Sequence, residues 1–171
     1  MNRIRTVLFV AAALSFLELI LPAGDATGQQ KTLGEQLVGT WSYVSVDIVR
    51  PDGSRVPLYG PDPSGLASFD AAGRYVLITA RTGIPKFASN NRNEGTAEEN
   101  KAVVEGSIAH FGRYTIDEAH KTITFHIQTS TFPNWNGIDQ TRPFTMTATE
   151  LKWTTAASSG GTAEVVLRRA N

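Results

Sequence analysis

The stretch LVGTWSYVS, residues 37–45, carries the residues on which the interpretation of the fold depends. It opens a run of β-branched and aromatic residues that predicts a strand over residues 38–49. Because side chains alternate across a strand, Gly39 and Trp41 share one face of it. Gly39 has no side chain and leaves room for a neighbouring group beside the indole. We therefore expect Trp41 to be buried.

Further runs rich in Val, Ile, Thr, Tyr and Phe follow, separated by Gly, Pro, Asp and Asn. With the first strand they make eight expected strands, the others lying near residues 65–70, 73–80, 111–117, 121–130, 139–148, 150–155 and 163–169. The segments PDGS (51–54), DAAGR (70–74) and DEAHK (117–121) have the residues of tight turns. Because these connections are short, neighbouring strands should pair in sequence order, which predicts an all-β antiparallel barrel or sandwich.

One interval breaks this pattern: residues 96–111, TAEENKAVVEGSIAHF. Thr96 stands in the N-cap position with Glu99 three residues later, which is a capping box, and apolar residues then recur at roughly helical spacing. The interval predicts a single helix inserted between strands. The preceding segment, residues 82–95, is long, polar and glycine-rich, with Phe87 as its only aromatic residue. Such a composition is typical of a lid-like loop.

Residues 1–28 have the organisation of a secretory signal peptide. A short basic start precedes a compact apolar run, VLFVAAALSFL, and the small residues ATG offer a cleavage site near Gly28. A membrane anchor is the alternative, but Glu18 and Pro22 interrupt the run before it reaches the roughly 18–20 apolar residues of a spanning helix. We therefore expect one domain over residues 37–171, periplasmic or secreted, with no membrane span in the mature chain.

The composition excludes several classes of function. The chain balances 16 Lys and Arg residues against 16 Asp and Glu residues, so no basic surface for nucleic acid or anionic membrane is expected. It contains no cysteine, which excludes disulfides, thiolate metal sites and a cysteine nucleophile. The motifs of serine hydrolases, zinc proteases, phosphate-binding loops and dinucleotide sites are also missing. The sequence predicts no metal, no cofactor and no nucleic-acid partner, and it contains no catalytic signature.

Several short motifs occur in a characteristic order. After the Gly39-x-Trp41 motif come YGPDPSG (59–65), KFAS (86–89), GTAEE (95–99), HFGRYTID (110–117), FPNW (132–135) and DQTR (139–142). Their order resembles that of the bacterial and fungal lipocalin-like domain family, over about residues 37–169. The resemblance implies an eight-stranded antiparallel barrel of the calycin type. The pattern of residues 96–111 predicts one helix inserted in it.

The resemblance also implies how one barrel end is closed. In lipocalins a tryptophan closes that end and an arginine from the last strand lies across it. Trp41 and Arg169 match this pair, whereas Arg168 points to the opposite face of its strand. The family often has paired histidines in the strand before FPNW, but here only His126 is present, with Phe125 beside it. This departure weakens any paired-histidine chemistry.

The segment FPNWNGIDQ, residues 132–140, has more large side chains than a hairpin turn needs. Phe132 and Trp135 either cap the barrel core or line the entrance to a ligand cavity. In the following strand, Gln140 and Arg142 alternate on one face. They either hydrogen-bond a polar or anionic ligand group or face solvent.

His110 and Tyr114 lie where the predicted helix ends and a strand begins. His110 either complements the helix C-terminus or contacts ligand, and Tyr114 either packs in the core or contacts ligand. In the strand 121–130, His126 shares the polar face, so it is either exposed or brought into a pocket by a bulge. The candidate ligand-binding residues are therefore Phe87, His110, Tyr114, His126, Phe132, Trp135, Gln140 and Arg142.

The leading hypothesis is an exported lipocalin-like barrel that binds a small, mainly hydrophobic molecule. Two alternatives stay open. One is a cyclase-type or isomerase-type enzyme that uses His126, Tyr114 or Arg142 in the barrel cavity. The other is a structural envelope protein with a filled barrel, because eight strands are just wide enough to be filled by side chains or to hold one small ligand.

Overall fold

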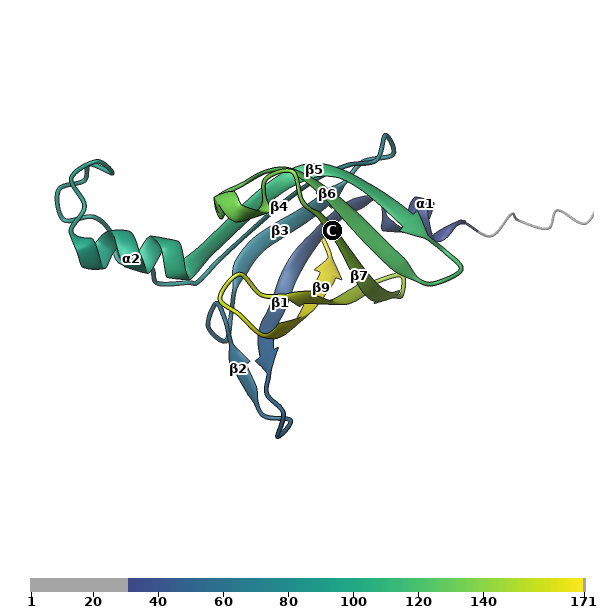
Figure 1. Ribbon diagram of the computed structural model, residues 1–171, viewed down its shortest axis with the longest axis horizontal. Helices are drawn as coiled ribbons and strands as arrows, with labels where there is room; N and C mark the ends of the chain where they lie inside the picture. The colour runs from purple at the N-terminus through teal and green to yellow at the C-terminus, as the bar shows by residue number, and fades with distance from the viewer. Residues whose placement is uncertain (1–30, 171) are drawn as a thin grey trace, which may run out of the picture. The chain divides into compact units, whose positions relative to one another are not determined.

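A computed structural model describes residues 31–170, so the predicted signal peptide, residues 1–28, lies outside the described residues. A closed barrel is formed by β1 (Gly39–Val49), β3 (Ser64–Phe69), β4 (Arg74–Ala80), β5 (Ser107–Asp117), β6 (Thr122–Ser130), β7 (Asp139–Met146), β8 (Glu150–Ala156) and β9 (Thr162–Arg169). These strands pair antiparallel in sequence order, and β1 also pairs with β9 to close the barrel (Figure 1). The predicted all-β, eight-stranded antiparallel barrel with one inserted helix is confirmed.

Two short elements escaped the sequence analysis. β2 (Arg55–Pro57) pairs with the last residues of β1, and it is too short for any alternation to be visible. α1 (Leu33–Leu37) precedes β1, begins with a capping box of Thr32 and Glu35, and buries Leu37.

The inserted helix, α2 (Ala97–Gly106), begins at the predicted capping box. The Thr96 hydroxyl accepts a hydrogen bond from the Glu99 N–H, and the Glu99 carboxylate accepts one from the Thr96 N–H. Both bonds satisfy donors that a helix start leaves without partners. Within residues 31–170, no helix is long and apolar enough to cross a membrane.

The predicted end of this helix, at residue 111, is wrong. Ser107 already has an extended backbone and begins β5. Ile108 and Phe111 are three residues apart, as helix neighbours would be, but both pair with β4 as strand residues. The helix stops after Gly106 because pairing with β4 begins there, and sequence periodicity alone does not reveal that pairing.

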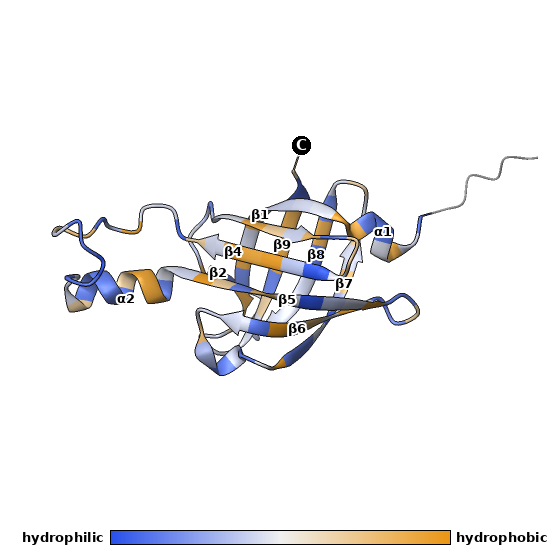
Figure 2. Ribbon diagram, turned by 90° about the horizontal axis from the view of Figure 1, so that it is seen from above, coloured by the Kyte–Doolittle hydropathy of each residue, from blue (hydrophilic) through white to orange (hydrophobic). Residues whose placement is uncertain are grey.

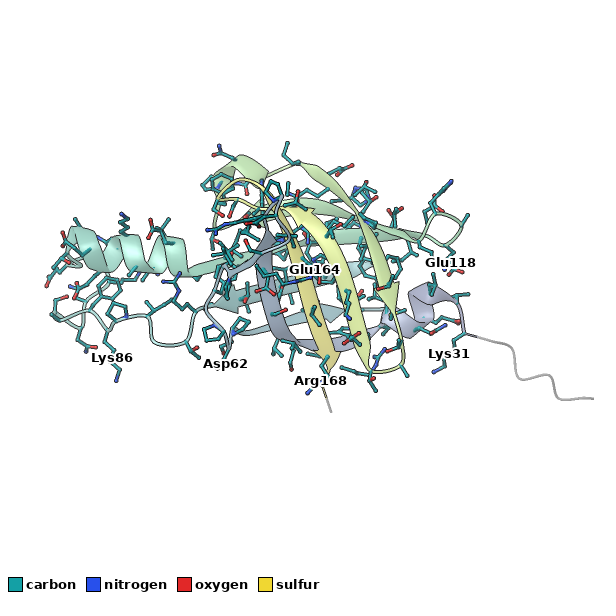
Figure 3. The ribbon with its side chains drawn as sticks, turned by 90° about the horizontal axis from the view of Figure 1, so that it is seen from below. Lys31, Asp62, Lys86, Glu118, Glu164 and Arg168 are labelled. Atoms are coloured by element: carbon teal, nitrogen blue, oxygen red, sulfur yellow. The ribbon has the colours of Figure 1, made fainter. Side chains whose placement is uncertain are left out.

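α2 and the loop over residues 82–95 project together from one end of the barrel (Figure 1). The loop packs against itself, since the Phe87 ring lies where a side chain at Gly95 would be, and it contacts the helix, since the Ala88 N–H donates to the Glu99 carboxylate at 2.8 Å. Lys86 lies out along this arm, away from the strands (Figure 3). The loop predicted to be lid-like is thus part of an arm that packs along α2.

Apolar side chains alternate into the barrel, as the sequence of β6 predicts: Ile123, Phe125 and Ile127 are all buried. Apolar and polar bands follow one another along the strands (Figure 2). After Ile127 the pairing with β5 shifts register, and Ser130, which uninterrupted alternation would place on the solvent face, is buried. A bulge adds one residue to a strand and so reverses the facing beyond it.

The closed end of the barrel has the expected geometry. Trp41 is fully buried, and its indole N–H donates to the Leu37 carbonyl at 2.9 Å. The guanidinium carbon of Arg169 lies 4.0 Å from the centre of the Trp41 ring. Gly39 has a φ of 127°, and a Cβ there would lie 3.0 Å from Nη1 of Arg169. The predicted pairing of Trp41 with Arg169 beside a glycine is confirmed.

Candidate functional site

Two hollows adjoin each other at the barrel end that carries α2. The inner cavity lies between the strands and has a volume of about 50 Å³, which holds about three to five water-sized groups. The mouth cleft lies outside it, beside the end of α2 and the loop that carries the short helix η1 (Pro133–Trp135), and has a volume of about 520 Å³. Both hollows are lined by Leu58, Tyr59, Ile108 and Ser158. The cleft therefore borders the cavity directly.

Arg142 is the one charged residue that lines the inner cavity. It alternates with Phe144 and Met146 on the inner face of β7 and is only 3% exposed. Its guanidinium carbon lies 4.4 Å from the centre of the Phe125 ring, and its Nη2 donates to Oε1 of Gln140 at 2.6 Å. Burial lowers its pKa to about 10, so Arg142 remains protonated at neutral pH.

Three buried polar atoms of the inner cavity have no hydrogen-bond partner within residues 31–170. They are Nε of Arg142, Oγ1 of Thr79 and Nε1 of Trp153. All three can donate a hydrogen bond. Leaving a buried donor without a partner costs about 1–3 kcal/mol, and proteins seldom do so. Three of the residues that line the cavity therefore carry a donor without a partner in that range, and one of the three is positively charged.

His110 lies on β5 and faces the inner cavity, so the expectation that it complements the C-terminus of the helix is wrong. Its Nδ1 is 2.7 Å from the hydroxyl oxygen of Tyr75, and its ring meets that of Trp135 edge to face at 5.7 Å. Burial, assisted by the charge of Arg142, lowers the pKa of His110 from 6.5 to about 3. The imidazole is therefore neutral at physiological pH.

The two aromatic residues of the FPNW motif belong to different hollows. Trp135 lines the inner cavity and Phe132 lines the mouth cleft, and their rings meet edge to face at 5.6 Å. The Ser130 N–H donates to the Asn136 side chain at 2.7 Å, which ties the loop to β6. The loop therefore packs against the core and contributes one ring to the lining of each hollow.

The remaining candidates lie elsewhere. The Tyr114 hydroxyl donates to the Asp70 carbonyl at 2.8 Å, and its ring packs edge to face on Phe69 in the core. His126 lies on the outer face of β6, where it is partly exposed. Phe87 lies on the arm and lines neither hollow. Gln140 reaches the site through its hydrogen bond to Arg142.

The three residues named for the enzyme alternative do not come together in one cavity. Of His126, Tyr114 and Arg142, only Arg142 lines the inner cavity. Within residues 31–170, no three His, Cys, Asp or Glu side chains are grouped so that they could hold a metal ion. The site instead unites His110, Trp135 and Arg142 around one small hollow.

Sequence reasoning missed Thr79 and Trp153. Strand alternation could have found both, because Thr79 alternates with Leu77 in β4 and Trp153 alternates with Leu151 in β8. Both neighbours are core residues. A polar group on the core face of a strand is a signal for a site.

A family model described as "Lipocalin-like domain" matches residues 38–168. The chain belongs to the lipocalin-like domain family. The match covers the barrel from β1 to β9 and includes the Gly39-x-Trp41 motif, the FPNW loop and Arg142. No curated protein sequence matches this lipocalin-like protein.

Solved structures similar to this lipocalin-like barrel include designed and natural proteins. A redesigned β-barrel is 16% identical, with a TM-score of 0.43, over 82% of this chain and 100% of its own. An uncharacterised protein of Bacteroides eggerthii is 12% identical, with a TM-score of 0.42, over 78% of this chain and 99% of its own. A second redesigned β-barrel, bound to DFHBI, is 17% identical, with a TM-score of 0.40, over 81% of this chain and 100% of its own.

Proposed function

We propose that this protein is a binding module, an exported lipocalin-like barrel that holds a small, mainly hydrophobic molecule. The observation that carries the proposal is the mouth cleft, which borders the inner cavity at one barrel end. Its volume of about 520 Å³ falls within the range of about 300–1,000 Å³ typical of small-molecule sites. Apolar side chains contribute much of its lining: Leu58, Tyr59, Val103, Val104, Ile108 and Phe132.

Titration with N-phenylnaphthylamine, an uncharged apolar fluorophore, tests this proposal. We expect saturable binding, measured as an increase in fluorescence. Trp135→Ala should weaken binding by about tenfold, equal to about 1.4 kcal/mol, because it removes the ring on which Phe132 of the mouth cleft packs edge to face. Phe87→Ala is the matched control, since Phe87 lines neither hollow, and its affinity should equal that of the wild type. Absence of saturable binding by the wild-type protein would contradict the proposal.

The export part of the proposal rests on the pattern of residues 1–28 alone. Intact mass measurement of the protein recovered from the periplasm or medium of a bacterial host tests it. We expect a mass that lacks about the first 28 residues, as a signal peptide of this length predicts. Recovery of the full-length chain in the cytoplasm alone would contradict export and leave the binding proposal standing.

A further inference from the structure

The inner cavity restricts the ligand beyond its apolar character, and the following inference rests on the proposed binding function. We propose that the ligand carries one carboxylate, which occupies the inner cavity and is bound by Arg142, while its apolar remainder fills the mouth cleft. The ligand class is thus an apolar monocarboxylate.

The charge of Arg142 is buried and has no counter-ion among the described residues. Arg142 is 3% exposed, and within residues 31–170 it forms no ion pair. No Asp or Glu lines the inner cavity. Burial raises the pKa of both Tyr43 and Tyr75, so these neighbours stay neutral. A buried charge without a partner is unfavourable, and an incoming anion removes that cost.

Residues that line the inner cavity carry hydrogen-bond donors without partners within residues 31–170. Arg142, Thr79 and Trp153 line one cavity. Nε of Arg142, the Thr79 hydroxyl and the Trp153 indole N–H have no hydrogen-bond partner among the described residues. A carboxylate has two oxygens and about four acceptor positions. It can therefore satisfy several donors at once, whereas an alcohol or an amine brings donors of its own.

The guanidinium of Arg142 is held in a fixed position. Its carbon lies 4.4 Å from the centre of the Phe125 ring and 5.7 Å from that of Trp153, and Nη2 is held by Gln140. Stacking on aromatic rings leaves the edge of the planar group free for in-plane hydrogen bonds. Arginine binds carboxylates in that plane, often through two parallel bonds.

The volume of the inner cavity and the single charge of Arg142 match a carboxylate group. The inner cavity, at about 50 Å³, admits a carboxylate group but no ring or chain of useful length. One arginine balances one negative charge, whereas a phosphate monoester carries about two at neutral pH. The larger mouth cleft directly outside the cavity has room for the apolar part.

A displacement experiment at pH 7 tests the inference, with bound N-phenylnaphthylamine as the reporter and decanoate and decanol as competitors of equal chain length. We expect decanoate to displace the fluorophore at a concentration at least about tenfold lower than decanol. Arg142→Met should abolish this preference while decanol still competes. Arg168→Met is the matched control, because Arg168 is exposed on the outer face of β9 (Figure 3), and it should keep the preference.

The outcomes separate the two proposals. If the fluorophore binds and the two competitors displace it equally, the carboxylate inference is wrong and the binding function stands. If the fluorophore does not bind to the wild-type protein, the binding function fails, and the inference fails with it.

A second measurement does not depend on folding of the Arg142 variant. The Nε–H resonance of Arg142 in the wild-type protein should shift on addition of decanoate and stay in place with decanol. Acetate, which has the same head group without the chain, should need a far higher concentration for the same shift. If acetate and decanoate act at equal concentrations, the cavity binds an adventitious anion only, and the inference is overturned.

Discussion

At the scale of single residues, two arginines with their side chains inside the fold have opposite environments. Arg169 stacks on Trp41, and all three of its nitrogens donate to backbone carbonyls, those of Ala148, Val38 and Gln36. Arg142 also stacks on an aromatic ring, but its Nε has no partner among the described residues. The arginine whose three nitrogens all have partners stabilises the closed end, whereas Arg142 keeps a donor without a partner among the described residues.

The closed end leads to a stability prediction. Trp41→Ala removes a fully buried indole together with the surface on which Arg169 stacks. The expected cost is about 3–5 kcal/mol, a large part of the 5–15 kcal/mol that holds a typical domain together. We expect a strongly lowered melting temperature or loss of the folded protein. Trp135→Ala, a partly buried tryptophan at the other end, should leave the melting temperature nearly unchanged. Equal melting temperatures for Trp41→Ala and the wild type would contradict the role of Trp41.

The pKa of His110 leads to a prediction of acid sensitivity. Because burial lowers this pKa from 6.5 to about 3, the unfolded chain binds a proton that the folded protein does not. Stability is therefore complete above pH 6.5 and falls as the pH drops toward 3, by about 1.4 kcal/mol per pH unit. Urea midpoints between pH 7 and 5 measure this slope.

His110→Gln should remove most of that slope. His120→Gln is the control, because His120 is exposed and hydrogen bonding to Asp117 raises its pKa, which acts in the opposite direction. This control should retain the decline in stability. An unchanged slope in His110→Gln would show that other groups carry the acid sensitivity.

At the scale of elements, the close approach of β5 and β6 depends on Gly112. A Cβ at this position would lie 2.1 Å from the His126 carbonyl oxygen and 2.9 Å from the Gln128 nitrogen. Both are backbone atoms of the paired strand, at the point where the register shifts. The clash can be relieved only by moving a strand.

Gly112→Ala should therefore destabilise the barrel by about 1–3 kcal/mol, the range for an overpacked site, as measured by the urea midpoint. Gly34→Ala serves as the control, because its nearest neighbour to the added Cβ is 3.9 Å away. Alanine in place of glycine inside α1 should be neutral or stabilising. A Gly112→Ala protein as stable as the wild type would mean that β5 and β6 separate here without cost.

The sequence predicts a helix or strand well where its apolar residues recur at one spacing along the whole element. β6 was predicted correctly because Ile123, Phe125 and Ile127 alternate without interruption. The start of β5 was not, because Ile108 and Phe111 have helical spacing and lie next to a true helix. Their strand conformation depends on pairing with β4, which is a contact distant in sequence.

The same distinction applies to the site. Arg142 could have been placed inside the barrel, because it alternates with Phe144 and Met146 on β7. The contact between His110 and Tyr75 could not, since it depends on the register of β5 against β4. Alternation places Thr79 and Trp153 on the core face, but it does not show that their donors lack partners, because that depends on which other side chains reach them.

At the scale of the whole molecule, the barrel is filled along most of its length and hollow at one end. Phe69, Phe125 and Trp153 are all buried in its interior, and about 50 Å³ remains beside Arg142. A protein with a purely structural role would gain stability by filling that space with an apolar side chain. Under the proposed binding function, the buried charge of Arg142 is retained at a cost in stability.

This trade-off leads to a last prediction. Arg142→Met keeps an unbranched side chain of similar length and removes a buried, unpaired charge, so the ligand-free variant should be as stable as the wild type or up to about 4 kcal/mol more stable. Decanoate at about 100 times its Kd should stabilise the wild type by about 2.7 kcal/mol and leave the variant almost unaffected. Melting temperatures of both proteins with and without decanoate measure both effects. Decanoate should raise the melting temperature of the wild type and leave that of the variant almost unchanged. If, in the absence of decanoate, the variant is less stable than the wild type, Arg142 stabilises the fold and is not retained for ligand binding.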